Sequence, residues 1–160
     1  MNFSIDRWKI IHISIAGIIF FASIILFGFI AQAMLDLAFR TLGIWGVLAY
    51  AEAQNAHYII RLGTDYLTAG FFGGLYVGYK VKEHLKAAAL FPAPFGLTVF
   101  FAVQYFLGYG IPPSSLTLIN LLKIIVAPLM ISTAGSYMGI YTVNWRVEEK
   151  PKEERISLIS

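Results

Sequence analysis

The feature that most constrains this chain is an apolar run over residues 10–33 that contains no Asp, Glu, Lys or Arg. A helix of about 20 such residues spans the ~30 Å hydrocarbon core of a bilayer. A secretory signal is the competing interpretation, because Arg7 and Lys9 precede the run and Ala31-Gln32-Ala33 has the form of a cleavage site. The run is much longer than the roughly 7–15 apolar residues of a signal sequence. We therefore expect a transmembrane helix here.

The composition of the whole chain extends this interpretation. Of the 160 residues, 58% are hydrophobic and 13% are charged, whereas soluble domains carry roughly 25% charged residues. A folded chain of about 150 residues still exposes roughly 30% of its unfolded surface, so this apolar surplus does not fit inside one small core. An ordinary soluble enzyme, a disordered chain and a coiled coil are excluded. The chain has no cysteine, which excludes disulfides and thiolate metal sites.

Three further apolar runs complete the expected fold, an all-α bundle of four transmembrane helices. The expected spans are residues 10–33, 56–79, 94–109 and 116–141. We expect them to form a single membrane domain, 1–145, followed by a charged cytoplasmic tail, 146–160.

Two of the connections between these spans have their own expected structure. Segment 37–54 carries Trp45 and Tyr50, and amphipathic aromatic rings favour the membrane interface. We place this segment at the outer surface. Pro92 and Pro94 argue against a regular helix leading into the third span, although Pro94 is tolerated in a first helical turn.

The basic residues predict how the helices are oriented. Because positively charged loops tend to remain in the cytoplasm, we expect a multi-pass protein of the cell membrane with both termini cytoplasmic. The net charge of +3 then reflects membrane orientation, and nucleic-acid binding is not expected. Nine of the 12 Lys and Arg residues lie on the proposed cytoplasmic side: Arg7, Lys9, Lys80, Lys82, Lys86, Arg146, Lys150, Lys152 and Arg155.

Two stretches of the sequence match each other. Thr68–Tyr76 and Thr133–Tyr141 share Thr, Ala, two Gly and Tyr at equivalent positions, 65 residues apart. Two tandem helical hairpins in the same orientation produce such a match; chance convergence on small residues in two helices produces it as well. With a true repeat the second span starts near residue 56, and without one it starts near residue 64.

Glycines recur at intervals of four in both matching stretches. Lipid tails are as apolar as leucine, so membrane helices associate through close backbone packing, which small residues allow. We expect these glycines to pack spans two and four together within one bundle. The alternative is that one of the strips joins neighbouring protomers or another subunit. The glycines are Gly70, Gly74 and Gly78 in the second span and Gly135 and Gly139 in the fourth.

The polar residues inside or near the spans are the other candidates. Lys123 is the one formal charge well inside a predicted span, about 10 Å from its outer end. Such a charge is costly and suggests a site by default; the alternative is that its flexible side chain reaches the outer interface. Asn120 shares its sector of the helix. Asp65 is the expected counter-ion, with Arg61 competing for the same carboxylate from four residues earlier.

No catalytic, cofactor or metal site is expected. His12, His57 and His84 fall at different depths, which does not suit a haem or metal ligand pair. The sequence has no G-x-S-x-G nucleophile elbow. The glycine-rich segment 70–78 lies within a predicted span with no preceding strand, so it is not a nucleotide-binding loop.

Three functions remain open. The first is a non-catalytic accessory subunit that packs against other membrane subunits within the lipid bilayer. The second is a small transporter or channel, assembled as a homo-oligomer or from the two hairpins, with a polar route near Lys123, Asn120, Asp65 and Gln104. The third, an intramembrane enzyme acting on lipid, has no residue cluster to support it. The lack of catalytic ligands and the two glycine strips favour the first.

Overall fold

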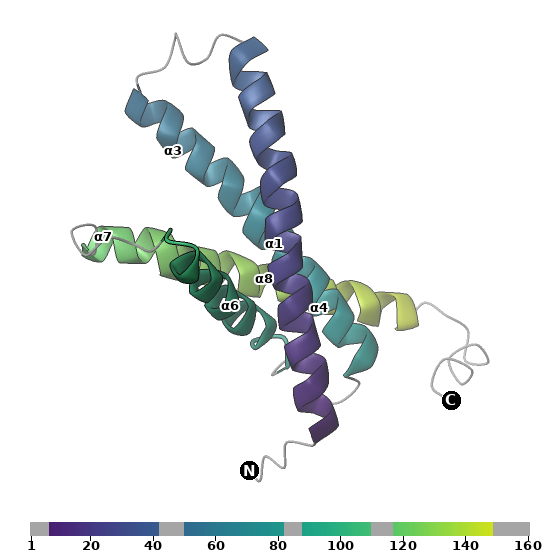
Figure 1. Ribbon diagram of the computed structural model, residues 1–160. Coiled ribbons are helices and arrows are strands. Elements are labelled where there is room, and N and C mark those ends of the chain that lie inside the picture. The colour runs from purple at the N-terminus through teal and green to yellow at the C-terminus, as the bar shows by residue number, and fades with distance from the viewer. Residues whose placement is uncertain (1–6, 42–49, 82–87, 110–116, 149–160) are drawn as a thin grey trace.

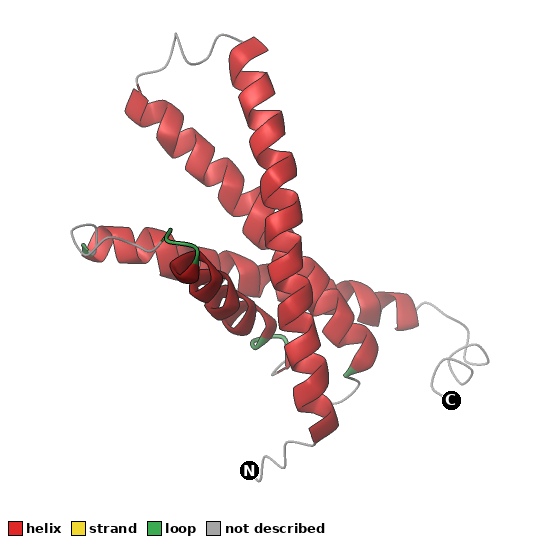
Figure 2. Ribbon diagram, viewed as in Figure 1, coloured by secondary structure: helices red, strands yellow, loops and turns green. Residues whose placement is uncertain are grey.

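The structure is a computed structural model, and it describes residues 7–41, 50–81, 88–109 and 117–148. The described residues are almost entirely helical and contain no strand (Figure 2). Two stretches, Arg7–Ala38 and Leu118–Val143, are long and apolar enough to cross a membrane.

The helices form four long segments. The first is α1 (Arg7–Thr41) and the third is α6 (Pro92–Phe106). The second and fourth segments each join two α-helices through a π-helical turn. The second comprises α3 (Tyr50–Arg61), the turn η1 (Leu62–Leu67) and α4 (Thr68–Lys80). The fourth comprises α7 (Leu118–Leu121), the turn η3 (Leu122–Val126) and α8 (Ala127–Glu148).

The four segments alternate in direction and cross near the middle of α1 (Figure 1). The buried apolar residues gather at this crossing. Phe20 and Ile24 of α1 pack with Ala69 of α4 and with Ala93 and Leu97 of α6. Away from the crossing the segments diverge, most plainly α1 from α3. Their apolar side chains there are exposed, so the structure has a compact centre and open ends.

Glycines hold α1 and α6 together at the crossing. A Cβ on Gly17 would overlap the ring of Phe95, and a Cβ on Gly96 would overlap the ring of Phe20. Each helix therefore places one aromatic ring over a glycine of the other. This reciprocal packing fixes how the first and third segments cross.

The helix boundaries differ from the sequence-based expectation in several places. The second segment is helical from Tyr50, earlier than either expected start. The third begins at Pro92 rather than at 94, because the first helical turn does not need the N–H groups that proline lacks. The fourth continues to Glu148, so the first residues of the expected tail are helical.

Several expected features lie outside the described residues. These are part of the interfacial segment (42–49), most of the loop after the second span (82–87) and the tail from residue 149. Of the interfacial segment, residues 37–41 continue α1 and residues 50–54 begin α3.

Candidate functional site

The closest helix pair in the structure is α4 with α8. Gly70 faces Ser132, Gly74 faces Ser136, and Gly78 faces Ile140 and Val143. Residue numbers rise together along the contact, so the two helices run parallel. At Gly70 and Gly74 a Cβ would overlap the backbone of α8, and only glycine permits this approach.

The glycines of α8 face α4 in the same way. Gly135 lies against the carbonyl oxygen of Leu67, and Gly139 lies against that of Phe71. A shift of 65 residues converts the contact between Gly70 and Ser132 into the contact between Gly135 and Leu67. The same shift converts the contact between Gly74 and Ser136 into that between Gly139 and Phe71. The two helices thus contact each other through equivalent positions.

Serine side chains complete this interface. The hydroxyl of Ser136 donates a 3.1 Å hydrogen bond to the carbonyl oxygen of Gly70. The hydroxyl of Ser132 is buried and has no hydrogen-bond partner within the described part of the chain. In both residues the short side chain allows the close backbone approach that drives helix association in membranes.

Each π-helical turn is supported by side chains that reach its carbonyl groups. A π turn disturbs the regular i→i−4 hydrogen bonds of an α-helix. Tyr58 donates a 2.7 Å hydrogen bond from its hydroxyl to the backbone carbonyl of Lys123, in η3. Near η1, Thr64 donates to the carbonyl of Ile60 at 3.0 Å, and Thr68 donates to that of Thr64.

Asp65 is the buried charged residue of this region. Only 1% of its side chain is exposed, and its Oδ2 atom lies 2.8 Å from Nε of Arg61. Thr64 donates to the other carboxylate oxygen at 2.9 Å. Gly28 of α1 faces both members of the ion pair, with its Cβ position 3.5 Å from Arg61 and 3.7 Å from Asp65. The absence of a side chain at Gly28 makes room for the pair.

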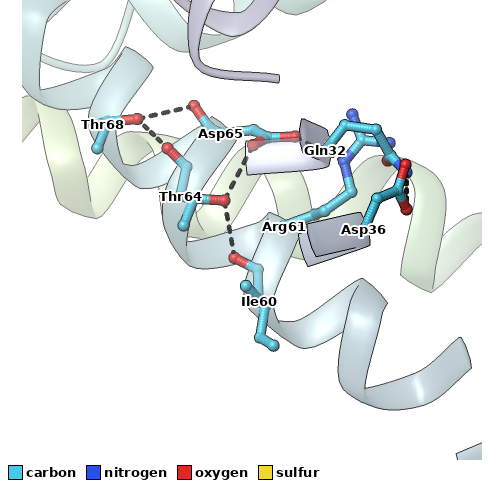
Figure 3. A network of polar contacts seen from close by, with 7 residues as sticks. All are labelled: Gln32, Asp36, Ile60, Arg61, Thr64, Asp65 and Thr68. Atoms are coloured by element: carbon cyan, nitrogen blue, oxygen red, sulfur yellow. Dashed lines mark hydrogen bonds and ion pairs between the residues drawn. The ribbon is translucent and has the colours of Figure 1, made fainter. Parts of the chain in front are cut away.

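A second polar contact on α1 lies one helical turn beyond Gly28. Gln32 donates a 3.0 Å hydrogen bond to Asp36. Figure 3 shows this pair on the side of the α3–η1 helix from which the Arg61 side chain extends. The Arg61 side chain is 41% exposed, so the ion pair is closed at its carboxylate and open at its guanidinium.

The expected pairing of Lys123 with Asp65 does not form. The carboxylate of Asp65 pairs with Arg61 on its own helix. Lys123 lies opposite Tyr58, which precedes Asp65 by seven residues or about 10 Å of helix. The Lys123 side chain is exposed rather than buried among the helices. The backbone N–H of Asn120 donates to the side chain of Thr117, which caps α7.

The histidines are not gathered into a metal site. Within the described residues, no group of three or more His, Asp or Glu side chains is placed to hold a metal ion. His12 instead forms a 2.9 Å hydrogen bond with the hydroxyl of Tyr76, linking α1 to α4. Trp8 packs edge-on against the His12 ring.

Sequence reasoning missed three contacts: Tyr58 with Lys123, Ser136 with Gly70, and His12 with Tyr76. The first was accessible in principle, because the two residues are 65 positions apart, the interval of the matching stretches. The π turns have no comparable sequence pattern.

Comparison with known proteins adds no relative. The chain matches no protein family, no curated protein and no solved structure.

Proposed function

We propose that this chain is a four-span membrane protein that acts as a non-catalytic accessory subunit of a larger membrane complex. Its single membrane domain has both termini in the cytoplasm. The domain consists of two tandem helical hairpins, α1 with α3–α4 and α6 with α7–α8, packed through the glycines of α4 and α8.

The parallel contact of α4 with α8 supports this topology. Two parallel membrane helices in one chain require a returning helix between them, and α6 runs in the returning direction (Figure 1). The equivalent contacts at a spacing of 65 residues support the tandem hairpins. The strong bias of basic residues supports the orientation.

The exposure of the apolar helices supports a lipid or protein environment. Only 33% of the most apolar part of α1 and 17% of that of the fourth segment are buried. The core helix of a soluble protein is mostly buried. These helices instead present bulky apolar side chains on their outer faces, among them Phe29, Met34, Phe106, Leu118 and Met130.

The observation that carries the accessory role is how the polar side chains are used. Asp65 binds Arg61, Ser136 binds the backbone of Gly70, and Tyr58 binds the backbone of Lys123. Each of these contacts stabilises a helix or joins two helices. A subunit whose polar groups hold its own helices together, and whose apolar faces are left exposed, is suited to packing in a complex.

Native purification in mild detergent tests this role. We expect other membrane proteins to copurify in a fixed stoichiometry, measured by native mass spectrometry. Recovery of the chain alone, as a monomer or a homo-oligomer, would contradict the proposal.

One observation favours the transporter or channel alternative: the ion pair of Asp65 and Arg61 lies where α1 and α3 begin to diverge. That function predicts flux of an ion or small solute through liposomes containing the purified protein. Flux that persists in Asp65→Ala and Lys123→Ala variants would count against a route past these residues.

A further inference from the structure

The helix α4 has a second buried strip beside its glycines. Its members are spaced by four residues: Asp65, Ala69, Gly73 and Val77. All four are buried, and Asp65, Ala69 and Val77 are at most 1% exposed.

This strip is covered by α1, which runs antiparallel to it. Gly28 faces Asp65, Phe20 and Ile24 pack with Ala69, and Ala16 packs with Val77. The numbers rise along α1 as they fall along α4. Small and large side chains alternate on α1, and they carry no charge.

The equivalent strip of α8 is not covered. A shift of 65 residues gives Met130, Ala134, Met138 and Thr142. Met130 is 67% exposed and Met138 is 56% exposed. Ala134 is exposed as well, and Thr142 is half-buried. The hydroxyl of Thr142 donates to the carbonyl of Met138 within the same helix, so the strip presents an apolar surface.

The helix α6 corresponds to α1 in the second hairpin, but it packs elsewhere. Its Ala93 and Leu97 lie with Phe20 and Ile24 of α1, and its Gly96 holds the ring of Phe20. The small residues of α6 are therefore committed to α1. No helix of the described chain covers the strip of α8 as α1 covers that of α4.

We propose that Met130, Ala134, Met138 and Thr142 form a docking surface for one membrane helix of a partner subunit. This inference rests on the accessory role proposed above and names its contact. By equivalence with α1 on α4, the partner helix runs antiparallel to α8. It is uncharged along the contact, because the position equivalent to Asp65 is Met130. Methionine is flexible and adapts to the shape of a bound helix.

Photocrosslinking of the full chain in its native membrane tests this surface. A photoreactive amino acid replaces Met130 in one variant and Met138 in another. Ile18 of α1 is the matched control, because it is 56% exposed, as Met138 is. We expect Met130 and Met138 to crosslink to one apolar helix of the subunit that copurifies. The Met138 adduct should lie earlier in the partner sequence than the Met130 adduct, and Ile18 should label lipid.

Three results would overturn the docking surface while the accessory role stands, provided that a partner still copurifies. They are lipid adducts alone at Met130 and Met138, adducts to a second copy of this chain, or partner adducts at Ile18 only. If no partner copurifies, both proposals fail.

A substitution gives a second measurement. In Met138→Trp the enlarged side chain obstructs the surface without touching the contact between α4 and α8. We expect about tenfold less copurified partner, a loss of ~1.4 kcal/mol of binding free energy. The same substitution at Ile18 should leave the yield of partner unchanged. Equal yields from both variants would overturn the proposal.

Discussion

Gly70 and Gly135 occupy equivalent positions on two helices that pack against each other in parallel. Gly70 lies against the backbone of Ser132, three residues before Gly135, and Gly135 lies against the backbone of Leu67, three residues before Gly70. Because each glycine meets backbone rather than a movable side chain, the helices cannot accept a Cβ at either position without separating.

Substitution in this contact should therefore be costly. We expect Gly74→Ala to lower the free energy of unfolding by at least about 1–3 kcal/mol, because the new Cβ overlaps Ser136. Gly63→Ala is the matched control, because no atom lies within 4 Å of its Cβ position. Thermal unfolding in detergent measures both, and about 1 kcal/mol shifts the midpoint by roughly 2–4 °C. Equal midpoints for the two variants would contradict the close contact.

The hydrogen bond from Tyr58 to the carbonyl of Lys123 should contribute modestly. Tyr58→Phe removes only the hydroxyl and leaves that carbonyl in η3 without this donor. We expect a loss of about 0.5–1.5 kcal/mol in the free energy of unfolding. Tyr105→Phe is the control, since Tyr105 is 72% exposed on α6. A control that loses as much stability as Tyr58→Phe would show that the bond contributes nothing specific.

The ion pair of Arg61 and Asp65 predicts an asymmetric response. Arg61→Gln leaves a carboxylate that is 1% exposed without its cation, whereas Asp65→Asn leaves a guanidinium that is 41% exposed and open to its surroundings. We expect Arg61→Gln to be the more destabilising variant, by about 1–3 kcal/mol relative to the parent. Comparison of the two unfolding midpoints in the same detergent measures the asymmetry, and the reverse order would contradict the burial of Asp65.

Space at Gly28 should matter to the same pair. Its Cβ position is 3.5 Å from Arg61, which alanine can accept but a larger side chain cannot. We expect Gly28→Leu to displace α1 from the ion pair and lower the unfolding midpoint, while Gly28→Ala stays near the parent. A leucine variant as stable as the alanine variant would show that α1 does not confine the pair.

The sequence predicted the helical character of the chain because its apolar runs are long and its polar residues cluster at their ends. Its two matching stretches also face each other in the structure. Small residues at intervals of four form one face of a helix, so the pattern indicates the contact surface directly.

The polar contacts were harder to predict because they depend on the offset between helices. Asp65 has two possible cations in the sequence, and the choice follows from the depth at which Lys123 lies relative to Tyr58. The π turns and the ring of Phe95 over Gly17 depend on local strain and on crossing geometry. Neither is encoded in the periodicity of one helix.

The membrane topology is the central claim, and labelling of single cysteines tests it most directly. The chain has no cysteine of its own, so Asn2→Cys, Ser114→Cys and Ser157→Cys each introduce one unique thiol. In intact cells an impermeant maleimide should react with Ser114→Cys only, and the other two should react after the membrane is opened. Labelling of Asn2→Cys and Ser157→Cys from opposite sides, or protection of Ser114→Cys in intact cells together with the two ends, would contradict four spans with cytoplasmic termini.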